Sequence, residues 1–128
     1  MRNKYRSKKI TRDGLTFDSL KEYRRFRELL LLEKSGAITD LKRQVAFELI
    51  PAQFEYIKTD EVYKRGERKG LPKFKRVCVE QSVVYNADFT YTENGKIVVE
   101  DTKGFRTKDY IIKRKLMLFF HDIRIKEI

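Results

Sequence analysis

VVYNADFTYTENGKIVVEDTK, residues 83–103, has the pattern of a β-hairpin. Two runs rich in β-branched and aromatic residues flank Asn94-Gly95, the dipeptide most typical of a type I′ turn. A two-residue loop places Glu93 directly opposite Lys96, and every further pair follows from that one. The stretch therefore predicts both an antiparallel strand pair and its register.

This register brings two carboxylates face to face. Counting back from the turn, Asp88 comes opposite Asp101, and Lys103 lies one pair further along the same face, opposite Asn86. Side chains on opposed residues have Cβ atoms roughly 4.5–5.5 Å apart. Because neighbouring carboxylates oppose each other's ionisation unless a cation intervenes, the pair is costly as scaffolding and suits a Mg²⁺ site. A one-residue bulge would break this register.

A divalent ion at this pair would serve phosphodiester hydrolysis. It could bind a phosphate oxygen and lower the pKa of a water molecule, while Lys103 orients that water or stabilises the developing negative charge. The alternative is a charged edge, Glu100–Lys103, that discourages aggregation. The apolar runs 84–89 and 97–99 are typical of central strands, which favours the metal site over the edge.

The remaining elements follow from periodicity and turn residues. We expect helices over Leu20–Lys34 and from about Lys108 to Phe120, the second capped by Thr107. We expect a strand around Val45–Leu49, a long hairpin with arms 53–63 and 74–85, and a last strand at Ile123–Ile125. The fold class is α/β (α+β), a mixed central sheet flanked by helices, with a protruding basic β-hairpin.

Composition limits the class of protein. The 128 residues carry 30 Lys and Arg against 19 Asp and Glu, a net charge of +11 that favours polyanions. The length predicts one domain over residues 17–128, preceded by a flexible basic arm over residues 1–16. No apolar run approaches a membrane span or a signal peptide, so we expect no membrane partner. One cysteine and one histidine exclude a disulfide and a zinc set, which leaves a hard cation held by carboxylates.

The hairpin also meets a family pattern. Asp88 begins one strand and Asp101-Thr102-Lys103 ends the next, which resembles the core of the PD-(D/E)xK nucleases, with Ala87 in place of the usual Pro and Asp101 in place of the usual Glu. With Phe17-Asp18-Ser19, 36–44 and 107–110, the chain is similar to a family of small phage and prophage proteins long catalogued without a function and grouped with that superfamily. The resemblance implies a restriction-endonuclease-like core. It also implies Asp88, Asp101 and the Thr102 carbonyl as Mg²⁺ or Mn²⁺ ligands, and Lys103 as the catalytic lysine.

Two further positions match that pattern. Glu22 lies where many members of the superfamily place a metal-binding glutamate, yet Ser19-x-x-Glu22 is also a capping box. Glu22 points within about 50° of the centre of the helix's apolar stripe, so the two roles are open as alternatives with and without metal. Gln44, which we expect to open the strand around Val45–Leu49, resembles a polar position near the site of related nucleases.

Basic residues supply the candidate DNA contacts. The helix that follows Lys103 begins with free amides beside the predicted site and carries several cations; the hairpin tip, residues 64–73, is long and strongly basic. Tyr56 and Tyr63 are candidates for base stacking or for strand packing. Cys78 is expected to be buried and His121 to lie at a helix C-terminus. The predicted nucleic-acid-binding residues are Gln44, Arg65, Arg68, Lys69, Lys73, Thr107, Lys108, Lys113 and Lys115.

Together these features predict that the chain is a metal-dependent endodeoxyribonuclease. We expect it in the cytoplasm, which is that of the bacterial host if the protein is phage-encoded. Small size, the phage-like resemblance and the basic hairpin favour branched DNA such as Holliday junctions, in phage DNA recombination or processing. A homodimer would suit two symmetric cuts. A non-catalytic nucleic-acid-binding protein of the same fold explains the charge equally well, and Asp101-Thr102-Lys103 opposite Asp88 favours the enzyme. A phage structural or host-inhibiting protein explains neither feature.

Overall fold

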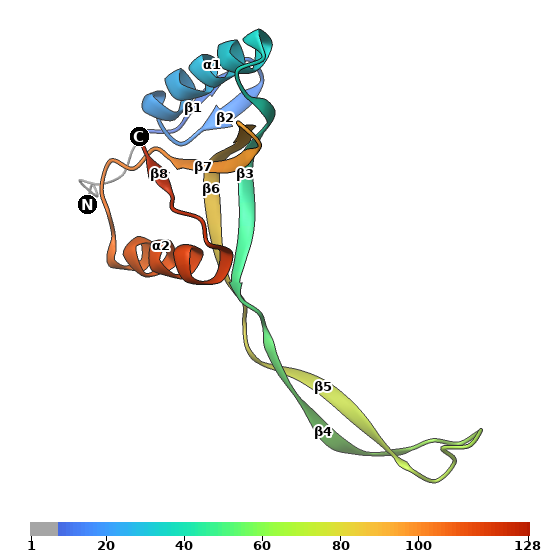
Figure 1. Cartoon of the computed structure of the whole chain (residues 1–128). Helices are drawn as coiled ribbons and strands as arrows, with labels where there is room; N and C mark the ends of the chain where they lie inside the picture. The colour runs from blue at the N-terminus through green and yellow to red at the C-terminus, as the bar shows by residue number, and fades with distance from the viewer. Residues whose placement is uncertain (1–7) are drawn as a thin grey trace. The chain divides into compact units, whose positions relative to one another are not determined.

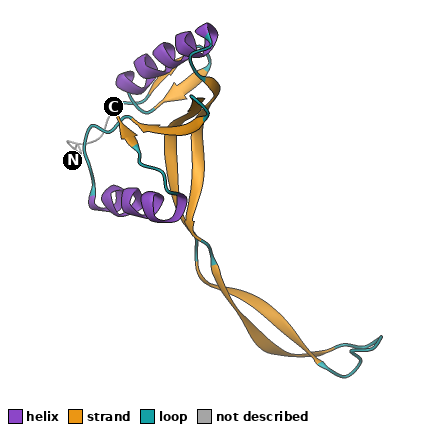
Figure 2. Ribbon diagram, viewed as in Figure 1, coloured by secondary structure: helices purple, strands orange, loops and turns teal. Residues whose placement is uncertain are grey.

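The structure, a computed structural model, describes residues 8–128. Figure 1 labels the helices and strands along the chain, and Figure 2 distinguishes helix, strand and loop. The strands are β1 (Ile10–Arg12), β2 (Leu15–Phe17), β3 (Thr39–Ile50), β4 (Gln53–Val62), β5 (Pro72–Glu80), β6 (Val83–Glu93), β7 (Lys96–Asp101) and β8 (Lys126–Glu127); the helices are α1 (Leu20–Ser35) and α2 (Lys108–His121).

A four-stranded mixed sheet forms the centre of the fold. Its strand order is β3-β6-β7-β8; β6 and β7 are antiparallel, and β8 runs parallel to β7. Helices α1 and α2 flank this sheet (Figure 1), so the predicted fold class, a mixed sheet with flanking helices, is confirmed.

The predicted register of the β6–β7 hairpin is confirmed for the five pairs from Glu93–Lys96 to Phe89–Glu100. Glu93 pairs with Lys96, and the pairing runs without a shift to Phe89 opposite Glu100. Asn94 and Gly95 both have positive φ, 51° and 77°, as a type I′ turn requires. Asp88 and Asp101 come directly after the last pair, where β7 ends.

Helix α1 packs on this hairpin through an apolar cluster and a buried ion pair. Leu29 of α1 lies with Ile38, Phe89 and Tyr91 in the core, and Phe26 stacks on Phe89. Glu100 of β7 is completely buried, and the Arg25 guanidinium of α1 donates to both of its oxygens at 2.8 and 2.7 Å. The second turn of α1, which contains Arg25, is thereby held on β7.

Helix α2 packs on the sheet through aromatic contacts. Tyr110 contacts Tyr85 of β6, and His121, the last residue of the helix, contacts Phe47 of β3. The prediction that Ile123–Ile125 forms the last strand is wrong: Asp122 ends the helix in a left-handed conformation, and the chain needs these three residues to reach β7, where β8 begins at Lys126.

The N-terminal segment differs from the predicted flexible arm. Residues 10–12 and 15–17 form the β1–β2 hairpin, turned by Asp13-Gly14, both with positive φ. This dipeptide is a hairpin signal in the sequence as well. The first seven residues of the predicted arm lie outside the described part of the chain.

The described residues divide into two compact units: one contains residues 8–47 and 85–128, and the other contains Glu48–Val84. In the second unit β4 and β5 pair as an antiparallel hairpin, as predicted, although residues 83–85 belong to β6 and not to the hairpin arm. Cys78 is exposed, against the prediction of burial. Within residues 8–128, β4 and β5 pair only with each other, and such a two-stranded ribbon has little interior in which to bury a side chain. Over residues 8–128 no helix has the length and apolarity needed to cross a membrane.

Candidate metal centre

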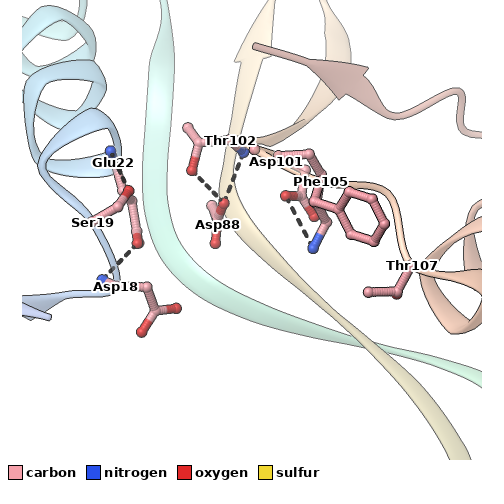
Figure 3. Close-up of a pocket in the computed structure, with 10 residues that line it drawn as sticks. Asp18, Ser19, Glu22, Asp88, Asp101, Thr102, Phe105 and Thr107 are labelled. Atoms are coloured by element: carbon pink, nitrogen blue, oxygen red, sulfur yellow. Dashed lines mark hydrogen bonds and ion pairs between the residues drawn. The ribbon is translucent and has the colours of Figure 1, made fainter. Parts of the chain in front are cut away.

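An open cavity of ≈ 420 Å³ lies in the first unit, where the start of α1, the middle of β6 and the end of β7 come together (Figure 3). Its lining is mostly polar and contains four carboxylic acids and one lysine. The lining residues are Asp18, Ser19, Glu22, Asp88, Asp101, Thr102, Lys103, Gly104, Phe105 and Thr107.

Three of these acids form a close set. One carboxylate oxygen each from Asp18, Glu22 and Asp88 lies within 4.8 Å of the other two. The sequence prediction placed Glu22 and Asp88 here and missed Asp18. Asp101 lines the same cavity but is not part of this close set among the described residues. Asp88 therefore joins Glu22 of α1 and Asp18, which precedes that helix, in addition to the predicted partner Asp101.

Glu22 is a buried acid at the first turn of α1, 1% exposed. Its amide donates to Ser19 Oγ at 3.1 Å, the first half of the predicted capping box. The return bond differs, because Glu22 Oε2 accepts from the amide of Asp18 (2.9 Å) rather than that of Ser19. Burial, with the charges of Asp88 and Asp18 nearby, raises the pKa of Glu22. The capping and acid-cluster roles of Glu22 thus coexist in one conformation.

Gln44 joins two of the acids. Its side-chain amide nitrogen donates to Glu22 Oε1 at 2.9 Å and lies 3.4 Å from Asp88 Oδ1. Gln44 lies inside β3 rather than opening a strand as predicted, and its φ of +52° is unusual for a non-glycine residue. Such conformations cost about 1–3 kcal/mol and persist where surrounding contacts enforce them. The contacts of Gln44 with the carboxylates of Glu22 and Asp88 are among those that accompany this strained conformation.

Asp88 is oriented by the end of β7. Its Oδ2 accepts from both the backbone amide and the hydroxyl of Thr102, each at 2.8 Å. Both bonds go to one oxygen, and Figure 3 shows them meeting at Asp88 between the α1 acids and Asp101. The other oxygen, Oδ1, faces Gln44. Asp88 therefore has one oxygen fixed by the protein and one turned toward the acid set.

Asp101 and Lys103 form the other side of the cavity. Asp101 is 2% exposed; its Oδ2 accepts from Tyr85 Oη at 2.6 Å, and its Oδ1 lies 3.5 Å from Lys103 Nζ. Burial, with the nearby charge of Asp88, raises the pKa of Asp101 to about 6 despite those two donors. The Lys103 ammonium also lies 4.5 Å from the centroid of the Tyr110 ring. Two contacts thus hold the lysine at the cavity.

The family model described as "Protein of unknown function (DUF1064)" matches residues 2–128. The chain belongs to this family. No curated protein and no solved structure matches this chain.

The predicted nucleic-acid contacts of this family member fall into two groups. Thr107 lines the cavity and caps α2 by accepting from the amide of Tyr110 at 3.1 Å. Lys108 and Lys115 on the same helix are exposed, and Lys113 is half-buried. The hairpin residues Arg65, Arg68, Lys69 and Lys73 all belong to the second unit.

Proposed function

We propose that the chain is a metal-dependent endodeoxyribonuclease that hydrolyses phosphodiester bonds. The observation that carries this proposal is a single cavity that collects the carboxylates of Glu22, Asp88 and Asp101 with the ammonium of Lys103. A cluster of mutually repelling acids, one fully buried and held by a strained glutamine, is hard to explain as scaffolding.

The donor set fits a hard divalent cation. All the close ligand atoms are carboxylate oxygens, which Mg²⁺ and Mn²⁺ prefer, and no described cysteine or histidine lines the cavity. Asp88 would be a shared ligand, with Glu22 and the newly found Asp18 on one side and Asp101 on the other. The Thr102 carbonyl stays a predicted ligand. A cation bound there would neutralise charge on a phosphoryl oxygen and activate water for attack on the phosphorus.

The chain's own groups would orient the reactants. Thr102 fixes Asp88 Oδ2 through two hydrogen bonds, so the other oxygen, Oδ1, which Gln44 contacts at 3.4 Å, points in a defined direction. Asp101 holds Lys103 beside the cavity, where the ammonium can donate to the attacking water or to the negative charge that develops on the phosphate. The amides at the start of α2, with Thr107, would contact a neighbouring phosphate.

DNA is the proposed substrate because the net charge of +11 suits a polyanion. The same proposal includes a substrate of branched DNA, such as Holliday junctions, and a role in phage DNA recombination or processing. It also includes a location in the cytoplasm and a homodimeric state. These parts rest on the small size of the chain, on its resemblance to small phage and prophage proteins grouped with the nuclease superfamily, and on the basic hairpin.

The test is cleavage of linear, flapped and four-way DNA in Mg²⁺, Mn²⁺ or EDTA. We expect cutting that requires metal and falls by at least about 100-fold in Asp88→Asn, Asp101→Asn and Lys103→Met. Asp40→Asn is a matched control, since Asp40 is exposed on β3 and asparagine tolerates its positive φ.

The outcomes separate the candidate functions. Tight DNA binding with no cutting in any metal would support the non-catalytic binding protein instead. Cutting that survives Asp88→Asn and Asp101→Asn would place the active site elsewhere.

A further inference from the structure

We propose that one face of the β4–β5 hairpin binds single-stranded DNA by stacking aromatic rings on unpaired bases. The aromatic-basic face, as we name it, consists of Phe54, Tyr56, Lys58, Phe74 and Arg76. The inference rests on the proposed function in that it takes DNA as the partner, and it narrows the substrate to DNA with unpaired bases.

The register of the hairpin places these side chains together. Tyr56 pairs with Arg76 and Lys58 pairs with Phe74, so the four residues lie on one side of the ribbon. Ile57 pairs with Lys75 and points to the opposite side. Sequence alone suggested Tyr56 as a stacking candidate, and the pairing adds Phe74 and the two cations.

These rings are exposed to an unusual degree for aromatic residues in strands. Tyr56 is 68% and Phe74 58% exposed. Among the described strands β4 and β5 pair only with each other, so the ribbon has no second sheet for the rings to pack on. A two-stranded hairpin without a core is marginally stable in water, and a ligand on its apolar face would stabilise it.

The spacing of Tyr56 and Phe74, the two most exposed rings of the aromatic-basic face, suits a base between them. Tyr56 and Phe74 are diagonal neighbours on the ribbon, and diagonal neighbours are about 7–8 Å apart. A flat base inserted between them would lie about 3.5–4 Å from each ring, the optimal contact distance. Side chains stand roughly perpendicular to a sheet, so the slot opens outward.

The charge at the tip and along the first half of β5 complements a phosphate backbone, whereas β4 carries the acids Glu55, Asp60 and Glu61 beside Lys58. Residues 63–76 contain seven Lys and Arg and one acidic residue, Glu67. The Arg76 guanidinium lies 3.5 Å over the Phe54 ring, and Arg68 and Lys73 lie 5.8 and 5.4 Å from the centroid of Tyr63. Cations interleaved with rings are the pattern of single-strand binding surfaces.

An intact duplex fits this face less well. In duplex DNA the π-faces of the bases are covered by their neighbours, and ribbons that enter the major groove read base edges with polar side chains. The aromatic-basic face offers rings instead. Unpaired bases, as in a flap, a fork or an open branch point, expose the surface that rings can cover.

The experiment uses the full chain in EDTA, which separates binding from cleavage, with fluorescein-labelled oligothymidylate of about 20 nucleotides and a duplex of equal length. Fluorescence anisotropy should show single-strand binding weakened at least about 5-fold by Tyr56→Ala and by Phe74→Ala. Ile57→Ala, on the opposite face, should change it less than about 2-fold. Tyr56→Phe, which keeps the ring, should bind like the wild type.

A spectroscopic readout guards against unfolding as the cause. The chain contains no tryptophan, so Tyr56→Trp introduces a single reporter. Its fluorescence should be quenched by oligothymidylate, whereas that of Ile57→Trp should not. Arg76→Gln should weaken binding more than Lys75→Gln, because Arg76 lies on the aromatic-basic face and Lys75 lies on the opposite one. A purely electrostatic contact would depend equally on both cations.

Several results would overturn the inference. One is equal quenching of the two tryptophan variants by oligothymidylate, and another is tighter binding of the duplex than of the single strand. A third is that substitutions on the aromatic-basic face change only the oligomeric state, which would assign this face to a protein partner. If single strands bind as expected and no metal supports cleavage, the nuclease proposal fails while this one stands.

Discussion

Replacement of Arg25 by methionine tests the buried ion pair that joins α1 to β7. In the wild type the guanidinium donates two hydrogen bonds to Glu100, which is completely buried and also accepts from Tyr91 Oη. Without Arg25 the buried carboxylate keeps Tyr91 Oη and the half-exposed Lys126 ammonium, 4.0 Å away, and these two partners replace its lost hydration only in part. Removal of one partner of such a pair costs about 3–5 kcal/mol. For a chain of this size that corresponds to a fall in Tm of roughly 10–20 °C.

The measurement is the free energy of unfolding from urea denaturation, with Arg27→Met as the matched control. Arg27 lies on the same helix, its side chain is 60% exposed, and its 3.7 Å contact with Asp13 should contribute less than about 1 kcal/mol. The double variant Arg25→Met/Glu100→Gln should recover part of the loss, since glutamine removes the charge and still accepts from Tyr91. A loss below about 1 kcal/mol for Arg25→Met, or no recovery in the double variant, would refute the reasoning.

Three further predictions concern the site and its hairpin. Asp101 has a folded pKa of about 6 against an ordinary 3.8, so the folded state binds the proton more tightly and its ionisation destabilises the metal-free protein as pH rises from about 4 past 6. Allowing for solvent screening, the cost is about 1–2 kcal/mol; in EDTA, Asp101→Asn should therefore unfold at higher urea than the wild type at pH 8, with the gap narrowing at pH 5. Thr102→Val removes one donor to Asp88 and should lower metal affinity or cleavage about 10–100-fold, whereas Thr102→Ser should not; equal effects would mean that the hydroxyl does not orient Asp88. Gly95→Ala, at φ +77°, should cost about 1 kcal/mol in urea unfolding, and no cost would mean that the turn is not held in this conformation.

Local sequence predicted the β6–β7 hairpin because its determinants are local. Asn94-Gly95 sets the turn, the turn sets the register, and the register runs unbroken to Glu100. Both helices were also predicted to within a residue or two, since their caps, Ser19 and Thr107, are sequence neighbours of the helices they begin.

The acid set could not be predicted in full because packing assembles it. Asp18 precedes a helix cap and has the local pattern of a turn residue, and only the docking of α1 on the sheet brings it near Asp88, far away in sequence. Gln44 gave no local signal of its left-handed conformation, in which its side chain contacts two carboxylates that are distant in sequence. The Asp13-Gly14 turn, by contrast, is set by a local dipeptide, so the β1–β2 hairpin has a signal in the sequence itself.

The adjacent acids Glu100 and Asp101 divide two tasks between them. Glu100 binds Arg25 of α1, whereas Asp101 lines the cavity and faces Lys103. Arg25 lies one helical turn after Glu22, so the ion pair that attaches α1 to β7 also sets where Glu22 meets Asp88. Loss of the Arg25–Glu100 ion pair should therefore move Glu22 relative to Asp88. If Glu22 and Asp88 share a cation, Arg25→Met should weaken Mn²⁺ binding even under conditions where the protein stays folded, while Arg27→Met leaves it unchanged. Equal Mn²⁺ affinity in the two folded variants would show that the position of α1 does not control the site.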